Sequence, residues 1–466
     1  MGNVYTVTGN ISGGISVQRS NIIIDGNGHW LLGSNYGTGV YLEHVNDVIL
    51  QNVKIEGFNS GIYLYHTNSS TVKRNIIIGT GIVVTQPSKG NQIVENTITR
   101  GGISFSFVQD SIIRGNDVCR ISVLASNNIT VNNNRIADDA REDVKLLYTE
   151  DVGGIDIDNT DNSNICGNII ERKIIGINIW HCANLKFSNN TLADNQVGFK
   201  LHGSSLKYNL HSIDTTNTVN GKQVYFLVNQ SDIQVPTDAG WIAAVNCKRI
   251  SVENWVSTPN WDAVLFINTS DSEIINSTFS GNFNAIRFDL VSNCTISGNQ
   301  VRNNGYAAFY FEDTIDCTIT KNNVMDNFCF FRIWHNSENN TFFHNNFIGN
   351  VTGSAAGRDD QNIWDNGLEG NYWEQYNGTD ANGDNIGDTK YIIDTHTDSV
   401  DKYPLMIPVS SFNVVPEFPS WTPTILALAV ITVALISYKR RLHTKIRNKK
   451  RACCKHELEK ENAKNG

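Results

Sequence analysis

The sequence is poor in proline and methionine, and its repeat region shows none of the apolar spacing typical of helices. It contains 8 Pro and 3 Met in 466 residues. Polar and apolar residues alternate instead, as in Gly61-Ile62-Tyr63-Leu64-Tyr65. This two-residue period indicates strands. The body of the chain is therefore predicted to be all-β, with many tight turns between short strands.

The 9 Cys include no CxxC pair and no spacing typical of a metal site. Cys294 and Cys317 occupy the same place in a repeat, each two residues before an isoleucine. We expect both thiols to stack in the core as small hydrophobic groups, with a disulfide as the alternative.

Basic residues are scarce outside the C-terminal end. The chain has 37 Lys+Arg and 46 Asp+Glu, a formal charge of −9. Residues 439–466 hold 11 Lys+Arg against 3 Glu, which leaves residues 1–438 with 26 basic and 43 acidic residues, or −17. Phosphate binding needs a basic surface, so this acidic body excludes nucleic acid as an expected partner.

A repeat of 20 to 23 residues dominates the sequence. Residues 293–301, Asn-Cys-Thr-Ile-Ser-Gly-Asn-Gln-Val, return at 316–324 and more loosely at 340–347. A fixed period of this length predicts one strand–turn–strand unit per repeat, stacked as a parallel β-helix. The recurrent Asn fits a turn with left-handed dihedrals or a hydrogen-bonded ladder. The anchors are Asn52, Asn75, Asn96, Asn116, Asn133, Asn168, Asn189, Asn254, Asn299, Asn322 and Asn345, with Ser277 in one slot.

The period also predicts the domain organisation. Rungs are expected over 1–350, with insertions at about 137–153 and 203–247, the second as a β-hairpin laid on the solenoid. Residues 351–412 lose the period and are predicted to form a C-terminal cap, followed by a linker at 413–420. The chain opens in a strand with no signal peptide. Because a terminal rung needs a cap, we expect the gene product to start upstream.

Residues 421–438 are uncharged and mainly apolar, near the lower length limit for a transmembrane helix. Lys439-Arg440-Arg441 opens the basic tail, 439–466. By the positive-inside rule this predicts a single-pass membrane protein with a cytoplasmic tail and an extracellular β-helix. A buried core helix is the alternative. Eleven Asn-X-Ser/Thr sequons agree with the extracellular placement, and Cys453-Cys454 lies where acylation is possible.

An Asp-rich loop lies in the predicted cap. Asp380, Asn382, Asp384 and Asp388 occupy positions 1, 3, 5 and 9, as oxygen ligands do at the start of an EF-hand loop. The match is incomplete, because Gly387 falls at position 8 and Tyr391 at position 12. The loop is a candidate calcium site, and a plain Asx-rich turn is the alternative.

The rungs, the Ile24-Asp25-Gly26-Asn27-Gly28 turn and the ending resemble the NosD-like proteins, within the wider carbohydrate-binding and sugar-hydrolase (CASH) set. In the ending, this resemblance is carried by Gly370-Asn371-Tyr372-Trp373, Asp380-Ala381-Asn382-Gly383-Asp384 and Tyr403-Pro404-Leu405. The resemblance covers about 3–408 and implies a right-handed parallel β-helix with a polysaccharide or cell-envelope glycan as partner.

The family name comes from a factor in copper supply, but scattered His, 3 Met and no CxxC give no soft-ligand cluster. Copper is therefore not expected here. Pro416-Glu417-Phe418, with the apolar segment and the basic cluster, resembles the C-terminal anchors of archaeal surface proteins.

Aligning the rungs predicts two outward columns along the solenoid, interrupted but not ended by the second insertion. The first column is Tyr63, Asp156, Asn178, Lys200, Arg287, Tyr310 and Arg332, and the second is Tyr65, Asp158, Trp180, His202, Ile267, Asp289, Glu312 and Trp334. Such a strip of aromatics and charges suits an extended sugar chain. The predicted carbohydrate-binding residues are Tyr65, Trp180, Lys200, Arg287, Asp289, Glu312, Arg332 and Trp334.

Asp156, Asp158 and His202 are the catalytic candidates. The two carboxylates lie two residues apart on one strand, about 6 to 7 Å apart, a separation that glycoside hydrolysis accepts. His202 lies two rungs from Asp158 and serves as a base only with substrate between them. Three functions stay open: a glycan binder, a polysaccharide hydrolase, lyase or epimerase, and a structural or copper-related envelope protein. The plain interpretation is a solvated polar wall.

Overall fold

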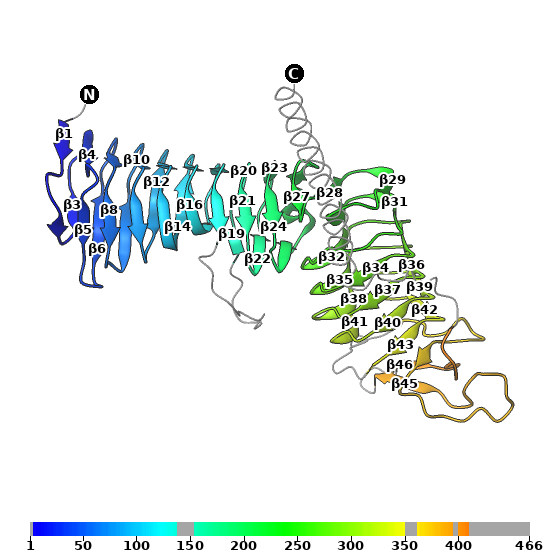
Figure 1. Cartoon of the computed structure of the whole chain (residues 1–466). Helices are drawn as coiled ribbons and strands as arrows, with labels where there is room; N and C mark the ends of the chain where they lie inside the picture. Colours follow the sequence, from blue (N-terminus) through cyan, green and yellow to red (C-terminus); the bar gives the residue numbers. More distant parts are fainter. Residues whose placement is uncertain (1–2, 138–152, 350–360, 395–398, 410–466) are drawn as a thin grey trace, which may run out of the picture. The chain divides into compact units, whose positions relative to one another are not determined.

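The computed structural model describes residues 3–137, 153–349, 361–394 and 399–409. Its strands are mostly short, and nearly all of them pair in parallel with the strand one repeat away (Figure 1). Thus β7 (Ile49–Gln51) pairs with β10 (Thr71–Lys73), which pairs with β13 (Gln92–Val94). The predicted parallel β-helix is confirmed.

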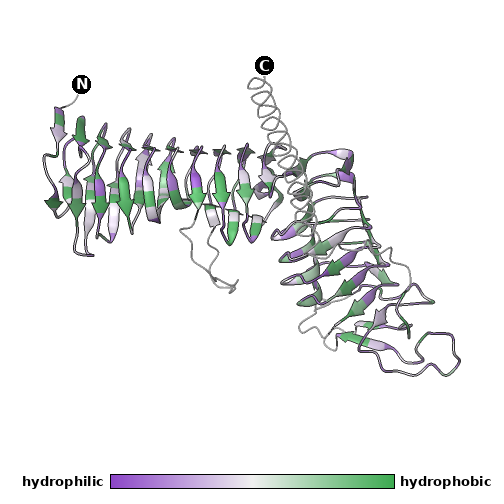
Figure 2. Cartoon of the chain, in the orientation of Figure 1, coloured by the Kyte–Doolittle hydropathy of each residue, from purple (hydrophilic) through white to green (hydrophobic). Residues whose placement is uncertain are grey.

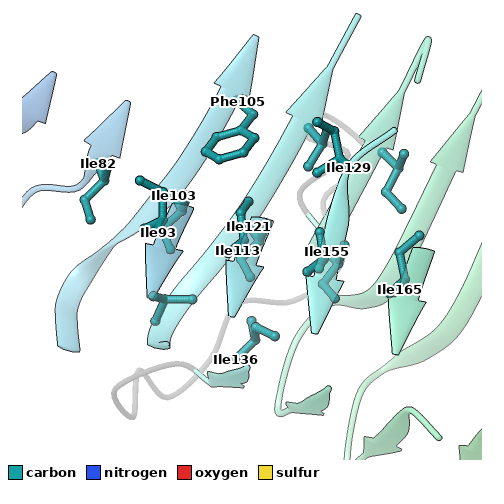
Figure 3. Packing of buried hydrophobic residues seen from close by; sticks show 14 of the residues in the cluster. Ile82, Ile93, Ile103, Phe105, Ile113, Ile121, Ile129, Ile136, Ile155 and Ile165 are labelled. Atoms are coloured by element: carbon teal, nitrogen blue, oxygen red, sulfur yellow. The ribbon is translucent and has the colours of Figure 1, made fainter. Parts of the chain in front are cut away.

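The inward side chains form continuous stacks because successive rungs are in register. Ile82, Ile103, Ile121 and Ile155 are cross-rung partners in strands β12 (Ile82–Lys89), β14 (Thr97–Gln109), β16 (Asp117–Leu124) and β19 (Gly153–Asp158) (Figure 3). Along many of the strands hydrophobic residues alternate with hydrophilic ones (Figure 2). Burial of these apolar stacks supplies the main favourable term in folding.

The second part of the solenoid uses aromatic rings in the same inward role. Phe266, Phe288 and Phe311 stack on successive rungs, with ring centres 5.4 and 5.3 Å apart. They lie on β32 (Asp262–Ile267), β35 (Asn284–Asp289) and β38 (Ala307–Glu312). The stack continues the pairing that sets the outward side chains of these strands in register.

A ladder of buried asparagines closes one turn of each rung. The backbone N–H of Asn299 and its Nδ2 both donate to Oδ1 of Asn322, at 3.0 and 2.9 Å. Asn322 repeats this toward Asn345. Most of the Asn anchors belong to this ladder. At four rungs the anchor lies one residue before the ladder position. The ladder holds Asn134 and Asn190 after the anchors at 133 and 189, and Val53 and Trp255 stand in it after the anchors at 52 and 254.

Those preceding asparagines have the other predicted role. Asn52, Asn133, Asn189 and Asn254 have φ between 53° and 55°, in the left-handed region that Asn tolerates. The turn residue and the ladder residue are therefore neighbours in the chain. The anchors predicted from the sequence include some residues of each kind.

The solenoid is built in two segments. The first ends at β25 (Val197–His202) and β27 (Thr218–Val219). Strand β27 turns back antiparallel into β28 (Lys222–Val228), which then pairs in parallel with β30 (Trp241–Val245). Much of the region predicted as an inserted hairpin thus forms the first rungs of the second segment. The other predicted insertion lies almost wholly outside the described residues.

The region predicted to be a cap carries aromatic residues onto the last rungs. Strand β44 (Tyr372–Trp373) pairs with β43 (Asn346–Ile348), and Trp373 stacks on Phe347 at 4.4 Å. The buried Asp401 accepts hydrogen bonds from the Asn371 N–H and from Trp373 Nε1.

The structure also bears on the predictions for the cysteines and for the membrane segment. The seven Cys among the described residues are free thiols, and Cys294 and Cys317 pack in the core as expected. The described residues include no helix long and apolar enough to cross a membrane. The predicted linker (413–420), membrane segment (421–438) and tail (439–466) lie outside them, as does Pro416-Glu417-Phe418.

We expect Asn322→Ala to lower the free energy of unfolding, because it leaves the buried N–H of Asn299 without an acceptor. Each such unsatisfied group costs about 1–3 kcal/mol. Urea unfolding followed by circular dichroism measures the effect. The matched control is Asn59→Ala, at an exposed asparagine. Equal midpoints for the two variants would contradict a structural role for the ladder.

Candidate functional site

The outward columns predicted from the sequence exist within each segment. In the first, Asp156, Asn178 and Lys200 are register partners, on β19, β22 (Ile175–Trp180) and β25. Three rungs separate Tyr63 and Tyr65 from Asp156 and Asp158, because β12, β14 and β16 lie between their strands. Tyr65 packs instead with His44 and His66.

In the second segment the columns run through β32, β35, β38 and β41 (Cys329–Trp334). Arg287, Tyr310 and Arg332 are register partners, and the next column holds Asp289, Glu312 and Trp334 in register. Ile267 is the register partner of Asp289, as predicted, but it is only 3% exposed and packs in the same hydrophobic cluster as the core of the first segment. This position of the second column is therefore covered and offers no surface to a ligand.

Lys200 nevertheless joins the two halves of the predicted strip. Its Nζ lies 4.0 Å from the ring centre of Trp261 and 5.6 Å from that of Trp180, both cation–π contacts. Backbone bonds fix this junction, because the Trp261 N–H donates to the Phe199 carbonyl at 3.3 Å. Residues of both segments therefore face one another at Lys200.

Arg287 is the central charge of the second segment and is 9% exposed. Its guanidinium lies 3.8 Å from the carboxylates of both Asp262 and Asp289 and packs over the Tyr310 ring. Burial raises the pKa of Asp262, although Arg287 opposes the shift. The 3.8 Å contacts are longer than hydrogen bonds, and Arg287 Nε has no hydrogen-bond partner.

Asp289 and Glu312 form a pair of carboxyl groups on adjacent rungs. Burial raises the pKa of Asp289 to about 6, with Arg287 opposing the shift and Glu312 adding to it. Glu312 Oε1 lies 3.1 Å from Nδ1 of the exposed His335. The two carboxyls therefore have different surroundings: Asp289 is largely buried beside Arg287, and Glu312 contacts an exposed histidine.

An aromatic ladder next to these groups was missed from the sequence. Trp261, Phe283, Tyr306 and Phe328 stack on four consecutive rungs, with ring centres 4.0, 4.9 and 6.2 Å apart. The Arg332 guanidinium lies over Tyr306 and Trp334.

A second asparagine repeat in the sequence could have revealed this aromatic ladder. Each ring follows a buried asparagine by one or two residues, and these asparagines also hydrogen-bond from rung to rung. They are Asn260, Asn282, Asn304 and Asn327.

The predicted catalytic residues of the first segment are engaged in other contacts. The buried Asp156 accepts hydrogen bonds from Arg120 Nε at 2.7 Å and from the Gly153 N–H at 2.8 Å. Asp158 accepts one from Asn159, and the His202 ring stacks on Trp180 at 4.0 Å. A substrate has to displace the Asp156 contacts before that carboxylate can react.

The Asp-rich loop uses its carboxylates to hold its own backbone. Asp380 accepts hydrogen bonds from the N–H groups of Gly383 and Asn385, and Asp388 accepts one from Ala381. Asp384 accepts bonds from the Ile386 N–H and from Asn382 Nδ2. This is the geometry of an Asx-rich turn, and calcium binding at the loop stays a prediction.

The fold and the matched family models define a class. Residues 99–216 match the model of the right-handed β-helix region, so the solenoid belongs to that class. Residues 3–110 and 229–378, more than half of the chain, match the model described as periplasmic copper-binding protein (NosD). The chain belongs to the NosD family.

No curated protein matches the chain. Among solved structures, the Dettilon tailspike protein (gp208) is 12% identical, with a TM-score of 0.26, over 70% of this chain and 60% of the tailspike. The periplasmic alginate epimerase AlgG is 10% identical, with a TM-score of 0.21, over 78% and 77%. The A-module of the Azotobacter vinelandii mannuronan C-5 epimerase AlgE6 is 11% identical, with a TM-score of 0.19, over 77% and 87%. The likeness at these identities is one of fold alone.

The family description names copper, and the described residues do not fit a copper centre. Copper favours thiolate, thioether and imidazole ligands. Burial raises the pKa of the Cys182 thiol to about 12, and it also raises the pKa of Cys247 and Cys329, which keeps these thiols protonated. Across the described ranges, no three His, Cys, Asp or Glu side chains are grouped to hold a metal.

We expect Asp289→Asn to change how stability depends on pH. Because the pKa of Asp289 rises on folding, the folded state favours its protonated form. Its contribution is therefore full below about pH 4 and is lost as pH rises through about 6. Relative to the wild type, the variant should gain stability between pH 4.5 and pH 7.5, measured by urea unfolding.

Asp316→Asn, at an exposed carboxylate, is the control for this measurement and should show no such gain. A gain of the same size in both variants would attribute the effect to general surface charge.

Proposed function

We propose that this protein binds an extended polysaccharide or cell-envelope glycan along the outward face of its second segment. The observation that carries the proposal is the ladder of stacked rings at 261, 283, 306 and 328. Aromatic rings offer rigid apolar surface to sugar rings, and this rigidity keeps the entropy cost of binding low. Phe328 is 48% exposed and Trp334 is 37% exposed, so both offer ring surface to a ligand.

Polar groups for sugar hydroxyls lie beside the rings. Asp289, Glu312 and His335 offer acceptors and donors, and Lys200, Arg287 and Arg332 provide local positive charge within an acidic body. Arginine pairs well with carboxylates, so sugars that carry carboxylates are favoured among the ligands. The repeat of about 4.8 Å between rungs presents equivalent groups to successive units of a polymer.

We further propose that the protein is attached to a membrane through residues 421–438, with the β-helix outside the cell. The uncharged segment and the cations that follow it support this arrangement. Recovery of the full chain in the membrane fraction, resistant to carbonate wash, is the expected result. Release into the soluble fraction would overturn the attachment but leave glycan binding untouched.

Calcium remains a proposal for the loop at 380–388. Binding needs the carboxylates to exchange backbone N–H groups for the ion, and Ca²⁺ takes six to eight oxygens. Calorimetric titration of Ca²⁺ into the wild type and into Asp384→Ala tests it. Equal heats for the two proteins would leave the loop as a plain Asx-rich turn.

Glycan binding should weaken when the exposed rings are removed. We expect Phe328→Ala and Trp334→Ala each to reduce affinity at least about tenfold, which corresponds to about 1.4 kcal/mol. A glycan array followed by surface plasmon resonance on the best ligand measures the change. Tyr36→Ala removes a ring that is 79% exposed in the first segment and should bind as the wild type does.

Loss of binding in all three variants, Tyr36→Ala included, would indicate nonspecific hydrophobic adsorption to exposed rings. No glycan binding by the wild type would overturn the proposal and favour a structural role in the cell envelope.

A further inference from the structure

We propose that Asp289 and Glu312 are the catalytic residues of a glycoside hydrolase that acts with retention of anomeric configuration. The inference rests on the proposed glycan binding, since the pair lies in the same outward face. It differs from the catalytic site predicted at Asp156 and Asp158, where one carboxylate is already held by Arg120 and a backbone N–H.

The fold places the two carboxyl-bearing residues one rung apart. Asp289 and Glu312 are register partners on β35 and β38, and neighbouring rungs lie about 4.8 Å apart. Their inward neighbours Phe288 and Phe311 stack and hold that register. Retaining glycosidases keep their two carboxyls about 5–5.5 Å apart, whereas inverting ones need a wider gap for water. Adjacent rungs therefore favour retention.

A nine-tenths buried arginine beside the two carboxyls distinguishes this pair from an ordinary cluster of surface acids. Arg287 Nε is buried without a hydrogen-bond partner, and the guanidinium contacts Asp289 only at 3.8 Å. Arg332 Nε is also buried without one, two rungs from Arg287. Both arginines lie in the column next to the carboxyl pair, and an unpaired buried donor of this kind is explained by a polar ligand bound along this face.

The two carboxyls have the unequal surroundings that the reaction needs. Asp289 is the more buried, and burial raises its pKa to about 6, so it can hold and deliver a proton near neutral pH. Glu312 is the more exposed of the two, and its Oε1 lies 3.1 Å from Nδ1 of His335, which can orient the carboxyl. This assigns Asp289 as the acid and Glu312 as the nucleophile.

The reaction proceeds in two balanced steps. The Glu312 carboxylate forms a bond to the anomeric carbon as the glycosidic bond breaks, and Asp289 gives its proton to the leaving oxygen. Water then attacks the anomeric carbon of the glycosyl ester, releases Glu312 as a carboxylate and returns a proton to Asp289. No oxidant, reductant or metal takes part. The open face of the solenoid predicts cleavage within a chain instead of at its end.

The test uses the purified full chain on polygalacturonate, alginate, xylan, mannan and cellulose. We expect new reducing ends from at least one polymer, with the anomeric configuration of the first product retained by NMR. Asp289→Asn and Glu312→Gln should each lower the rate at least a hundredfold and still bind the polymer. Asp316→Asn, an exposed carboxylate outside the site, should retain full activity.

The outcomes separate the inference from the function on which it rests. Binding without any cleavage, cleavage that persists in both variants, or inverted products would each overturn the catalytic pair and leave glycan binding standing. Products with the absorbance of an unsaturated sugar would overturn hydrolysis in favour of elimination. Absence of binding to every polymer tested would remove both proposals.

Discussion

The hydrogen bond from a buried turn N–H to an asparagine Oδ1 one rung away is the constraint on which the structure depends. A β-helix turn points backbone donors into the core, where an unpaired N–H is costly. Asn322 accepts from both the N–H and the side-chain amide of Asn299, and its own amide donates back to the Ile296 carbonyl of that same rung. Because most rungs use this bond, with the Ser277 hydroxyl as the acceptor at one of them, the turns superimpose and the strands between them stay in register.

This register is what brings functional groups together. Once turns superimpose, outward side chains from residues 22 or 23 apart become neighbours, as Asp289 and Glu312 do. The outward face of the second segment then contains charged side chains that are shielded from solvent but contact groups of opposite charge. Arg287 lies between two carboxylates and over a tyrosine ring, and burial raises the pKa of both Asp262 and Asp289. Stability from the apolar and amide stacks inside the solenoid offsets the cost of those polar groups outside.

Much of the fold follows from the sequence because the β-helix repeats a local pattern. Period, strand alternation and the dual use of asparagine were all readable, and so was the packing of Cys294 and Cys317. Three features were not. The ladder asparagine and the turn asparagine are adjacent, so spacing alone could not tell 133 from 134. The break after β25 depends on β27 turning antiparallel into β28, which no period records. The rings at 261, 283, 306 and 328 lie before the strands, outside the alternation from which outward columns were aligned.

The candidate site shows the same limit at the level of chemistry. Sequence spacing selects Asp156 and Asp158, because two carboxylates on one strand are visibly close. What makes a carboxyl reactive is its surroundings, and these come from other rungs: Arg120 engages Asp156, whereas no short hydrogen bond joins Asp289 to Arg287. A cross-rung pair also starts from the closer backbone spacing, about 4.8 Å between strands against about 6 to 7 Å for residues two apart on one strand. In a solenoid, register and burial therefore identify reactive groups better than proximity along the chain does.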